Sequence, residues 1–257
     1  MNDLSCGILQ QLFEVFAKTF IFAGYLFLYA RARVFDVPGT AWAWVLCFLG
    51  VDFLYYWFHR LSHERNGLWA MHLVHHSSEE YNLAVALRQS SLHGLFTWVF
   101  YLPLALIGVP PVTFVVCYGL NLLYQFWIHT QAVGRLGRLT EWVMNTPSHH
   151  RVHHGRNPRY LDRNHGGVLI VWDRLFGTFA AESERDPVVY GITHDLTTYN
   201  PLRIAVHEFV AIARDLGRAR SLKAALGYLF APPGWSPDGS TLTADQLRRG
   251  LGLQPRS

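Results

Sequence analysis

The sequence predicts an all-α integral membrane protein, a four-helix bundle that carries a histidine-rich helical cap on its cytoplasmic side. Two features of the chain lead to this fold class. Apolar residues make up 51% of the 257 residues and charged residues only 16%, against roughly 25% charged in an ordinary soluble domain. In addition, eight of the 14 histidines fall into three short clusters, each spaced to occupy one face of a helix.

Four apolar stretches approach the roughly 20 residues that a helix needs to cross a bilayer. They run at about residues 8–30, 41–58, 92–109 and 112–128, and the last two are joined by a short Gly/Pro turn. Tryptophans near the ends of these runs fit the aromatic belt of a membrane interface. The alternative is four buried helices of a soluble bundle, but the runs lack the polar faces that such helices carry.

Arginines set the expected orientation of the spans. Arg60, Arg65 and Arg88 lie between the second and third spans, and a basic segment at 135–174 follows the fourth. The positive-inside rule places both regions in the cytoplasm. Arginines directly after the first span oppose this topology, unless the first segment is a re-entrant hairpin. A basic segment also suits nucleic acid, but the neighbouring apolar runs favour an anionic membrane surface, so we expect no nucleic-acid partner.

The chain divides into three parts on these grounds. Residues 1–40 form an N-terminal membrane segment, and residues 41–193 hold three spans and all the histidine clusters. Residues 194–257 are expected to form basic amphipathic helices on the membrane surface, at about 203–228, followed by a polar tail.

The histidine clusters predict a dinuclear metal centre. Imidazole is the commonest protein metal ligand near neutral pH, and eight clustered histidines exceed the four ligands that one zinc ion usually takes. A polar stripe at the end of the fourth span adds a ninth expected ligand, with a hydrogen-bonded interfacial histidine as the alternative. The expected ligands are His59, His63, His72, His75, His76, His129, His150, His153 and His154. Imidazole suits zinc, copper, iron and nickel, so spacing does not name the metal.

Three further polar residues are expected to support chemistry at this centre. Asp52 shares a helical face with His59 and is expensive to bury in a span. It is expected either to accept a hydrogen bond from a ligand histidine or to pair with an arginine or tyrosine. Glu64 follows His63 and is either a partner of the ligands or a solvated carboxylate. Asn145, shortly before the third cluster, completes this set of catalytic candidates.

The remaining histidines are expected to be ordinary surface or core residues. His149 precedes the third cluster, but the repeated H-x-x-H-H spacing favours His150 as the ligand. The histidines that stand alone in the sequence are His93, His165, His194 and His207. Of these, His165 is the least ordinary, because it follows the third cluster closely.

The motifs H-x-x-x-H, H-x-x-H-H and H-x-x-H-H, separated by apolar hairpins, resemble those of the fatty acid hydroxylase and sterol desaturase superfamily of membrane di-iron oxygenases. Within it, the segments DFLYYWFHRLSHE, NLLYQFWIHT and NTPSHHRVHHGRN are most similar to the branch that oxidises alkylglycerols. The resemblance covers residues 51–193. The chain departs from that branch at His165, where tyrosine is typical.

The resemblance implies two iron ions held by the nine expected ligands, with O₂ and an electron donor as partners. It implies insertion of one oxygen atom into a C–H bond of a membrane lipid. In the alkylglycerol branch this carbon is next to the ether oxygen, and tetrahydrobiopterin supplies electrons. The alternatives are a sterol, fatty-acid or carotenoid hydroxylase or desaturase of the same superfamily and, more remotely, a non-enzymatic membrane metal-binding or transport protein.

Overall fold

The computed structural model describes residues 2–194 and 196–253, and within these ranges the protein is helical, with isolated β-bridges but no strands. The all-α prediction is therefore confirmed for the described part of the chain. In chain order the elements are α1 (Asn2–Ala32), α2 (Ala41–Glu64), α3 (Asn66–His76), α4 (Leu83–Ala86), α5 (His93–Thr97), the 3₁₀ helix η1 (Trp98–Tyr101), α6 (Leu102–Ile107), α7 (Pro111–Ile128), α8 (Arg138–Val143), α9 (Pro147–His153), α10 (Val171–Leu175), α11 (Pro201–Arg218), α12 (Leu222–Phe230) and α13 (Ala244–Gly250).

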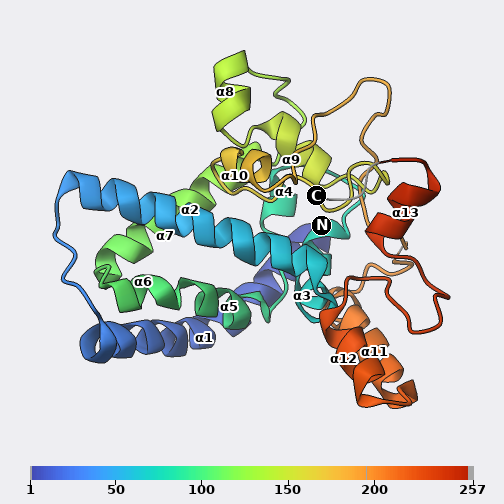
Figure 1. Cartoon of the computed structure of the whole chain (residues 1–257), viewed down its shortest axis with the longest axis horizontal. Coiled ribbons are helices and arrows are strands. Elements are labelled where there is room, and N and C mark those ends of the chain that lie inside the picture. The colour runs from blue at the N-terminus through green and yellow to red at the C-terminus, as the bar shows by residue number, and fades with distance from the viewer. Residues whose placement is uncertain (1, 195, 254–257) are drawn as a thin grey trace.

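The elongated left half of the molecule in Figure 1 is built from α1, α2, α6 and α7. α2 packs against α7, and α1 packs against α6. Buried Tyr25, Val51, Tyr101 and Leu104 join these elements in one apolar core. The C-terminal end of α2 leads into α3, and the short helices α4, α9 and α10 gather near that end (Figure 1).

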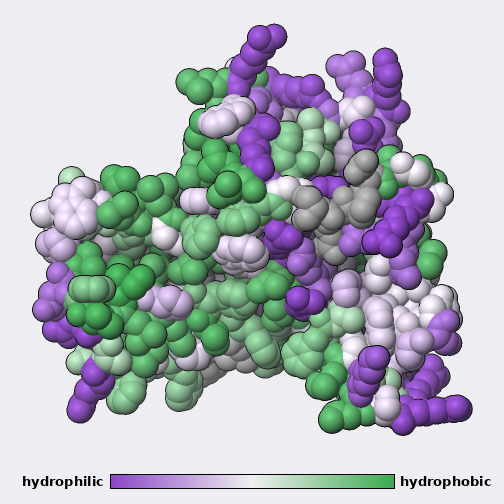
Figure 2. Space-filling model, in the orientation of Figure 1, coloured by the Kyte–Doolittle hydropathy of each residue, from purple (hydrophilic) through white to green (hydrophobic). Residues whose placement is uncertain are grey.

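α2 and α7 coincide with the second and fourth expected spans, and both are long and apolar enough to cross a membrane. Only 39% of the apolar window of α2 and 28% of that of α7 are buried, so most of their apolar side chains face outward. Figure 2 shows hydrophobic side chains gathered over this half of the molecule and hydrophilic ones over the other. A surface of this kind suits a lipid environment.

The first and third expected spans differ from the prediction. α1 is bent by 48° between Asp3–Val15 and Lys18–Ala32, and adds a third span only if the bent pair crosses as one. At residues 92–109 the structure shows α5, η1 and α6 in place of one long helix. Pro103, which has no N–H to donate, lies in the first turn of α6. The remaining apolar piece, Trp98–Ile107, is too short to cross a bilayer.

Within the expected C-terminal polar tail the structure adds one short helix, whereas residues 254–257 lie outside the described ranges. α11 and α12 cover the expected amphipathic region, but α13 follows them. Thr243 begins α13 by accepting a hydrogen bond from the backbone of Gln246. Arg248 is 1% exposed and donates to the Leu161 carbonyl, which fastens α13 to the loop after α9.

Candidate metal centre

All nine histidines expected as ligands are buried, and the fold gathers them into two groups. The five-histidine group contains His59, His63, His72, His76 and His153. The four-histidine group contains His75, His129, His150 and His154. Within each group, one ring nitrogen from every residue lies within 4.8 Å of the others. The arrangement has the ligand type and the compactness of two metal sites.

Each H-x-x-H-H helix contributes to both groups. In α3, His72 and His76 are one helical turn apart and belong to the five-histidine group, whereas His75 belongs to the other. In α9 the assignment is reversed, because the pair one turn apart joins the four-histidine group and His153 joins the five-histidine group. The rings of His76 and His154 stack with centroids 4.4 Å apart, so the two groups are in direct contact through these two imidazoles.

His63 and His129 occupy corresponding places at opposite ends of the centre. The His63 ring lies 4.7–5.4 Å from each of the other four rings of its group. The His129 ring lies 4.2–5.1 Å from each of the other three rings of its own group. Among the described residues, neither ring contacts the opposite group, whereas His72 and His153 face each other across the five-histidine group at 6.4 Å.

Backbone carbonyls fix the protonation of four of these rings. Because a carbonyl only accepts, each Nδ1 that contacts one must donate its hydrogen. The donors are His59 to His165 O (2.8 Å), His75 to Arg88 O (3.1 Å), His129 to Gln125 O (2.7 Å) and His153 to Arg163 O (2.9 Å). A neutral imidazole carries a single N–H, so the Nε2 atom of each ring is left as a lone pair. This is the second-sphere arrangement usual for histidines that bind metals.

The Nε2 atoms converge in a way that suits a bound cation. His129 Nε2 lies 3.2 Å from His75 Nε2, although both rings have used their only N–H on a carbonyl. Two lone pairs at that distance repel each other unless a positive ion lies between them. In addition, within the described part of the chain the buried Nε2 atoms of His63, His153 and His154 have no hydrogen-bond partner. The residues present therefore fit two bound metal ions.

Burial keeps these imidazoles neutral. It lowers the pKa of His129 to about 4 and that of His153 to about 3, since a charged ring would lose its hydration. The pKa of His150 is lowered well below its usual value by burial and then by the neighbouring His129 and His153. Neutral imidazole is the form that binds metal, so the ligands are ready near pH 7.

Asp52 ties the membrane helices to the loop beside the centre. It is fully buried, and its carboxylate accepts four hydrogen bonds, from Asn121 Nδ2 (2.8 Å), Val168 N (2.7 Å), Leu169 N (3.1 Å) and Trp172 Nε1 (2.9 Å). The bond expected from a ligand histidine is absent among the described residues, and neither an arginine nor a tyrosine pairs with it. Asp52 instead joins α2, α7 and α10, and so positions the loop whose carbonyl holds His59.

The two other catalytic candidates also make structural contacts. Glu64 accepts a hydrogen bond from Arg60, one helical turn earlier, at 2.8 Å. Asn145 is fully buried, and its side-chain Nδ2 donates to Gly166 O at 2.6 Å, while its backbone carbonyl accepts from Tyr124 Oη. Glu64 therefore forms an ion pair within α2, Asn145 joins neighbouring segments, and a chemical role for either residue stays a prediction.

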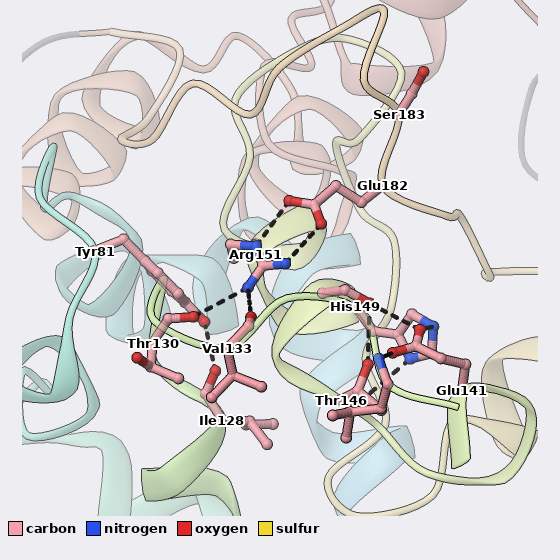
Figure 3. Close-up of polar contacts among 12 residues, drawn as sticks. Tyr81, Ile128, Thr130, Val133, Glu141, Thr146, His149, Arg151, Glu182 and Ser183 are labelled. Carbon is pink, nitrogen blue, oxygen red and sulfur yellow. Dashed lines mark hydrogen bonds and ion pairs between the residues drawn. The ribbon is translucent and has the colours of Figure 1, made fainter. Parts of the chain in front are cut away.

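Two polar pairs brace α9 from outside, as Figure 3 shows. Arg151 donates twice to the carboxylate of Glu182, at 2.8 and 2.7 Å, and also donates to the carbonyls of Thr130 and Val133. It thereby clamps the segment that follows His129 against α9 (Figure 3).

The second pair involves His149, whose Nε2 lies 2.9 Å from Glu141 Oε2. Figure 3 shows His149 directed at Glu141. His149 belongs to neither histidine group, whereas His150 belongs to the four-histidine group, as the spacing predicts.

Two of the solitary histidines are not isolated in space. His165 is fully buried, with its ring 5.0 Å from that of His63 and 5.8 Å from that of His153. His93 packs on Phe58 at 5.2 Å and lies 6.3 Å from His72. Sequence spacing does not reveal these contacts, because they arise from the loop after α9 and from the break that creates α5. His194 and His207 are exposed or partly exposed, as expected.

One cavity of about 610 Å³ opens onto the four-histidine group, a size usual for sites that bind small lipophilic ligands. His75, His129 and His150 line it, but no member of the five-histidine group does. Most of the remaining wall is apolar and comes from α1 and α7. Polar residues of α1 also line the cavity, and their one-turn spacing is the signal that the sequence carries for them.

Known proteins match the part of the chain that contains the histidine groups. A sequence model described as fatty acid hydroxylase matches residues 44–178. Alkylglycerol monooxygenase of Xenopus tropicalis is 47% identical over 238 residues, covering 92% of this chain and 52% of that protein. The protein of the same name from Homo sapiens is 46% identical, with 92% and 53% covered. Ornithine lipid hydroxylase OlsE of Rhizobium tropici is 31% identical over 150 residues, with 58% and 45% covered.

The chain thus spans about half the length of the curated relatives it matches. No solved structure matches it. The matched region contains all nine histidines, which lie in α2, α3 and α9 or directly follow α7 and α9.

Proposed function

The chain belongs to the fatty acid hydroxylase family, and on this premise we propose that it is a membrane di-iron monooxygenase of lipids. Its substrate is an alkylglycerol, hydroxylated at the carbon next to the ether oxygen. The observation that carries the proposal is the pair of buried histidine groups beside an apolar cavity. The named relatives supply the substrate class.

The nine histidines would hold the two ions, and iron is the metal of this family. When bound, iron supplies the redox chemistry by which O₂, two electrons and two protons convert a C–H bond into C–OH and water. The product of an alkylglycerol is a hemiacetal, which breaks into an aldehyde and glycerol. The electrons come from a diffusible donor, for which a reduced pterin is the first choice.

The two groups differ in how many coordination positions they would leave free on a bound metal. A metal with four histidine ligands keeps more coordination positions for other ligands than one with five. The cavity reaches three members of the four-histidine group and none of the five-histidine group. We therefore assign substrate approach to the four-histidine side.

The chain's own residues bind the substrate and exclude water. Leu122 and Phe126 of α7, with Ile8 and Leu12 of α1, give the cavity an apolar wall that accepts an alkyl chain from the bilayer. Asp52 acts as a positioning residue, because it fixes the loop that orients His59. By the positive-inside rule, the centre faces the cytoplasm, where O₂ and the reductant reach it.

The test uses iron-loaded full-length chain in lipid nanodiscs with hexadecylglycerol and tetrahydrobiopterin. Hexadecanal is expected with O₂ and none without it, measured by mass spectrometry after trapping the aldehyde. Aldehyde release that is unchanged without O₂ contradicts the oxygenase assignment. Oxidation of a sterol or fatty acid but not of the ether lipid contradicts the substrate assignment alone.

A further inference from the structure

α1 carries a polar stripe within an otherwise apolar helix. Gln10, Glu14 and Lys18 follow one another at one-turn intervals and therefore share a face. Gln10 and Glu14 are each only 7% exposed. Polar side chains buried at membrane depth are costly and are usually retained for function.

The stripe is held together by its own hydrogen bonds. Gln10 Nε2 donates to Glu14 Oε1 at 2.6 Å, and Lys18 Nζ lies 3.0 Å from Glu14 Oε2. Lys18 also donates to Gln11 Oε1 at 3.3 Å. These contacts leave further lone pairs on the carboxylate and further N–H groups on the amides and the ammonium. The stripe is therefore able to bind a polar ligand without losing its own contacts.

The stripe and the four-histidine group line the same cavity. Gln10, Gln11, Glu14 and Lys18 stand on the α1 side, and His75, His129 and His150 stand on the other elements. Apolar residues of α7 complete the wall. A ligand in this cavity therefore meets hydrogen-bonding groups of α1, an apolar surface and the metal site at once.

The hydrogen-bond donors and acceptors of Gln10, Glu14 and Lys18 indicate which lipid head group fits the cavity. A carboxylate accepts from hydroxyls, an ammonium donates to them, and a primary amide does both. A pair of neighbouring hydroxyls can satisfy all three, whereas a head without O–H groups leaves Glu14 without a donor from the ligand. We propose that Gln10, Glu14 and Lys18 bind the free hydroxyls of the lipid head and so select lipids with an unsubstituted glycerol diol. This inference rests on the proposed function, whose substrate it defines further.

The experiment measures lipid binding to the iron-loaded full-length chain in nanodiscs without O₂, so that no turnover occurs. The probes are hexadecylglycerol and its dimethyl ether, in which both hydroxyls are methylated. The native chain is expected to bind the diol roughly tenfold more tightly or better, and Glu14→Leu to remove this preference while leaving the ether unchanged. Thr19→Leu is the matched control, because Thr19 is exposed on the same helix and does not line the cavity.

Equal binding of the two lipids by the native chain overturns the inference, and so does equal weakening of both by Glu14→Leu. If Glu14→Leu fails to fold, Glu14→Gln keeps the shape of the side chain and should still weaken only the diol. Aldehyde release with O₂ is recorded separately. Selective binding of the diol without aldehyde release contradicts the proposed function but supports the head-group site. Aldehyde release with equal binding of the two lipids supports the proposed function but contradicts the head-group site.

Discussion

The five-histidine and four-histidine groups both draw ligands from the histidines of α3 and α9 but meet different surroundings. The five-histidine group is enclosed by α2, α3 and α9, and His165 packs against it. The four-histidine group includes His129 at the end of α7 and borders the cavity. Similar histidine motifs can therefore serve unlike sites, one enclosed and one open to a ligand.

The largest expected effect comes from removing one ligand of each group. His153→Ala and His150→Ala should each lower bound iron by about half and reduce turnover by more than about 100-fold, because a lost ligand costs more than a lost outer partner. Iron content is measured by plasma mass spectrometry. His207→Ala, a change at a partly exposed position, is the control. Full iron retention in both ligand variants contradicts the assignment.

Asp52→Asn should destabilise the five-histidine side first. The amide cannot accept all four hydrogen bonds, so the free energy of unfolding should fall by about 4 kcal/mol. The affected loop carries the carbonyl that holds His59. Thermal unfolding in detergent provides the measurement, with exposed Asp36→Asn as the control. An unchanged unfolding midpoint would show that the loop does not depend on Asp52.

Asp173 supports the same loop and gives it a pH dependence. Its carboxylate accepts from His165 N and Gly166 N at 2.7 Å, and burial raises its pKa to about 6. Because the unfolded pKa is about 3.9, folding favours the protonated form. The contribution of this group to stability is therefore full below about pH 4 and is lost as pH rises through about 6, by about 3 kcal/mol. Asp173→Asn should abolish this part of the pH profile; parallel curves for the two proteins contradict it.

Arg151→Lys should affect the four-histidine side, with the smallest effect of this series. Lysine cannot grip both oxygens of Glu182 and two carbonyls together. The segment after His129 should loosen, and metal at this group should bind roughly tenfold more weakly. Competition with a chelator measures the affinity. The control is Arg159→Lys, at a half-exposed position, which should leave the metal affinity unchanged. If Arg151→Lys weakens metal binding equally at both groups, Arg151 does not act on the four-histidine group alone.

The sequence predicts the fold well where an element depends only on its own residues, as in a continuous apolar helix. α2 and α7 are long apolar runs and form as continuous helices. The segment 92–109 is equally apolar but breaks into three pieces, because hydropathy does not report where a helix is interrupted. The placement of α13 involves a long-range contact between Arg248 and Leu161, which local sequence patterns do not predict.

The site shows the same division. One-turn spacing identified the nine histidines that the fold gathers, including His129 at the end of a polar stripe. The spacing could not divide them between two groups, because neighbours such as His75 and His76 diverge only when α3 meets α7 and α9. Asp52 was recognised as unusual from its burial in a span, but its four donors come from segments far along the chain.

The most direct test of two unlike metal sites is Mössbauer spectroscopy of the full-length chain loaded with ⁵⁷Fe. The two histidine groups predict two iron ions per chain in distinct environments of about equal intensity, one of which changes when hexadecylglycerol is added without O₂. His153→Ala should remove the environment that does not respond to the lipid. A single iron per chain, or two that respond identically to the lipid, would contradict the account.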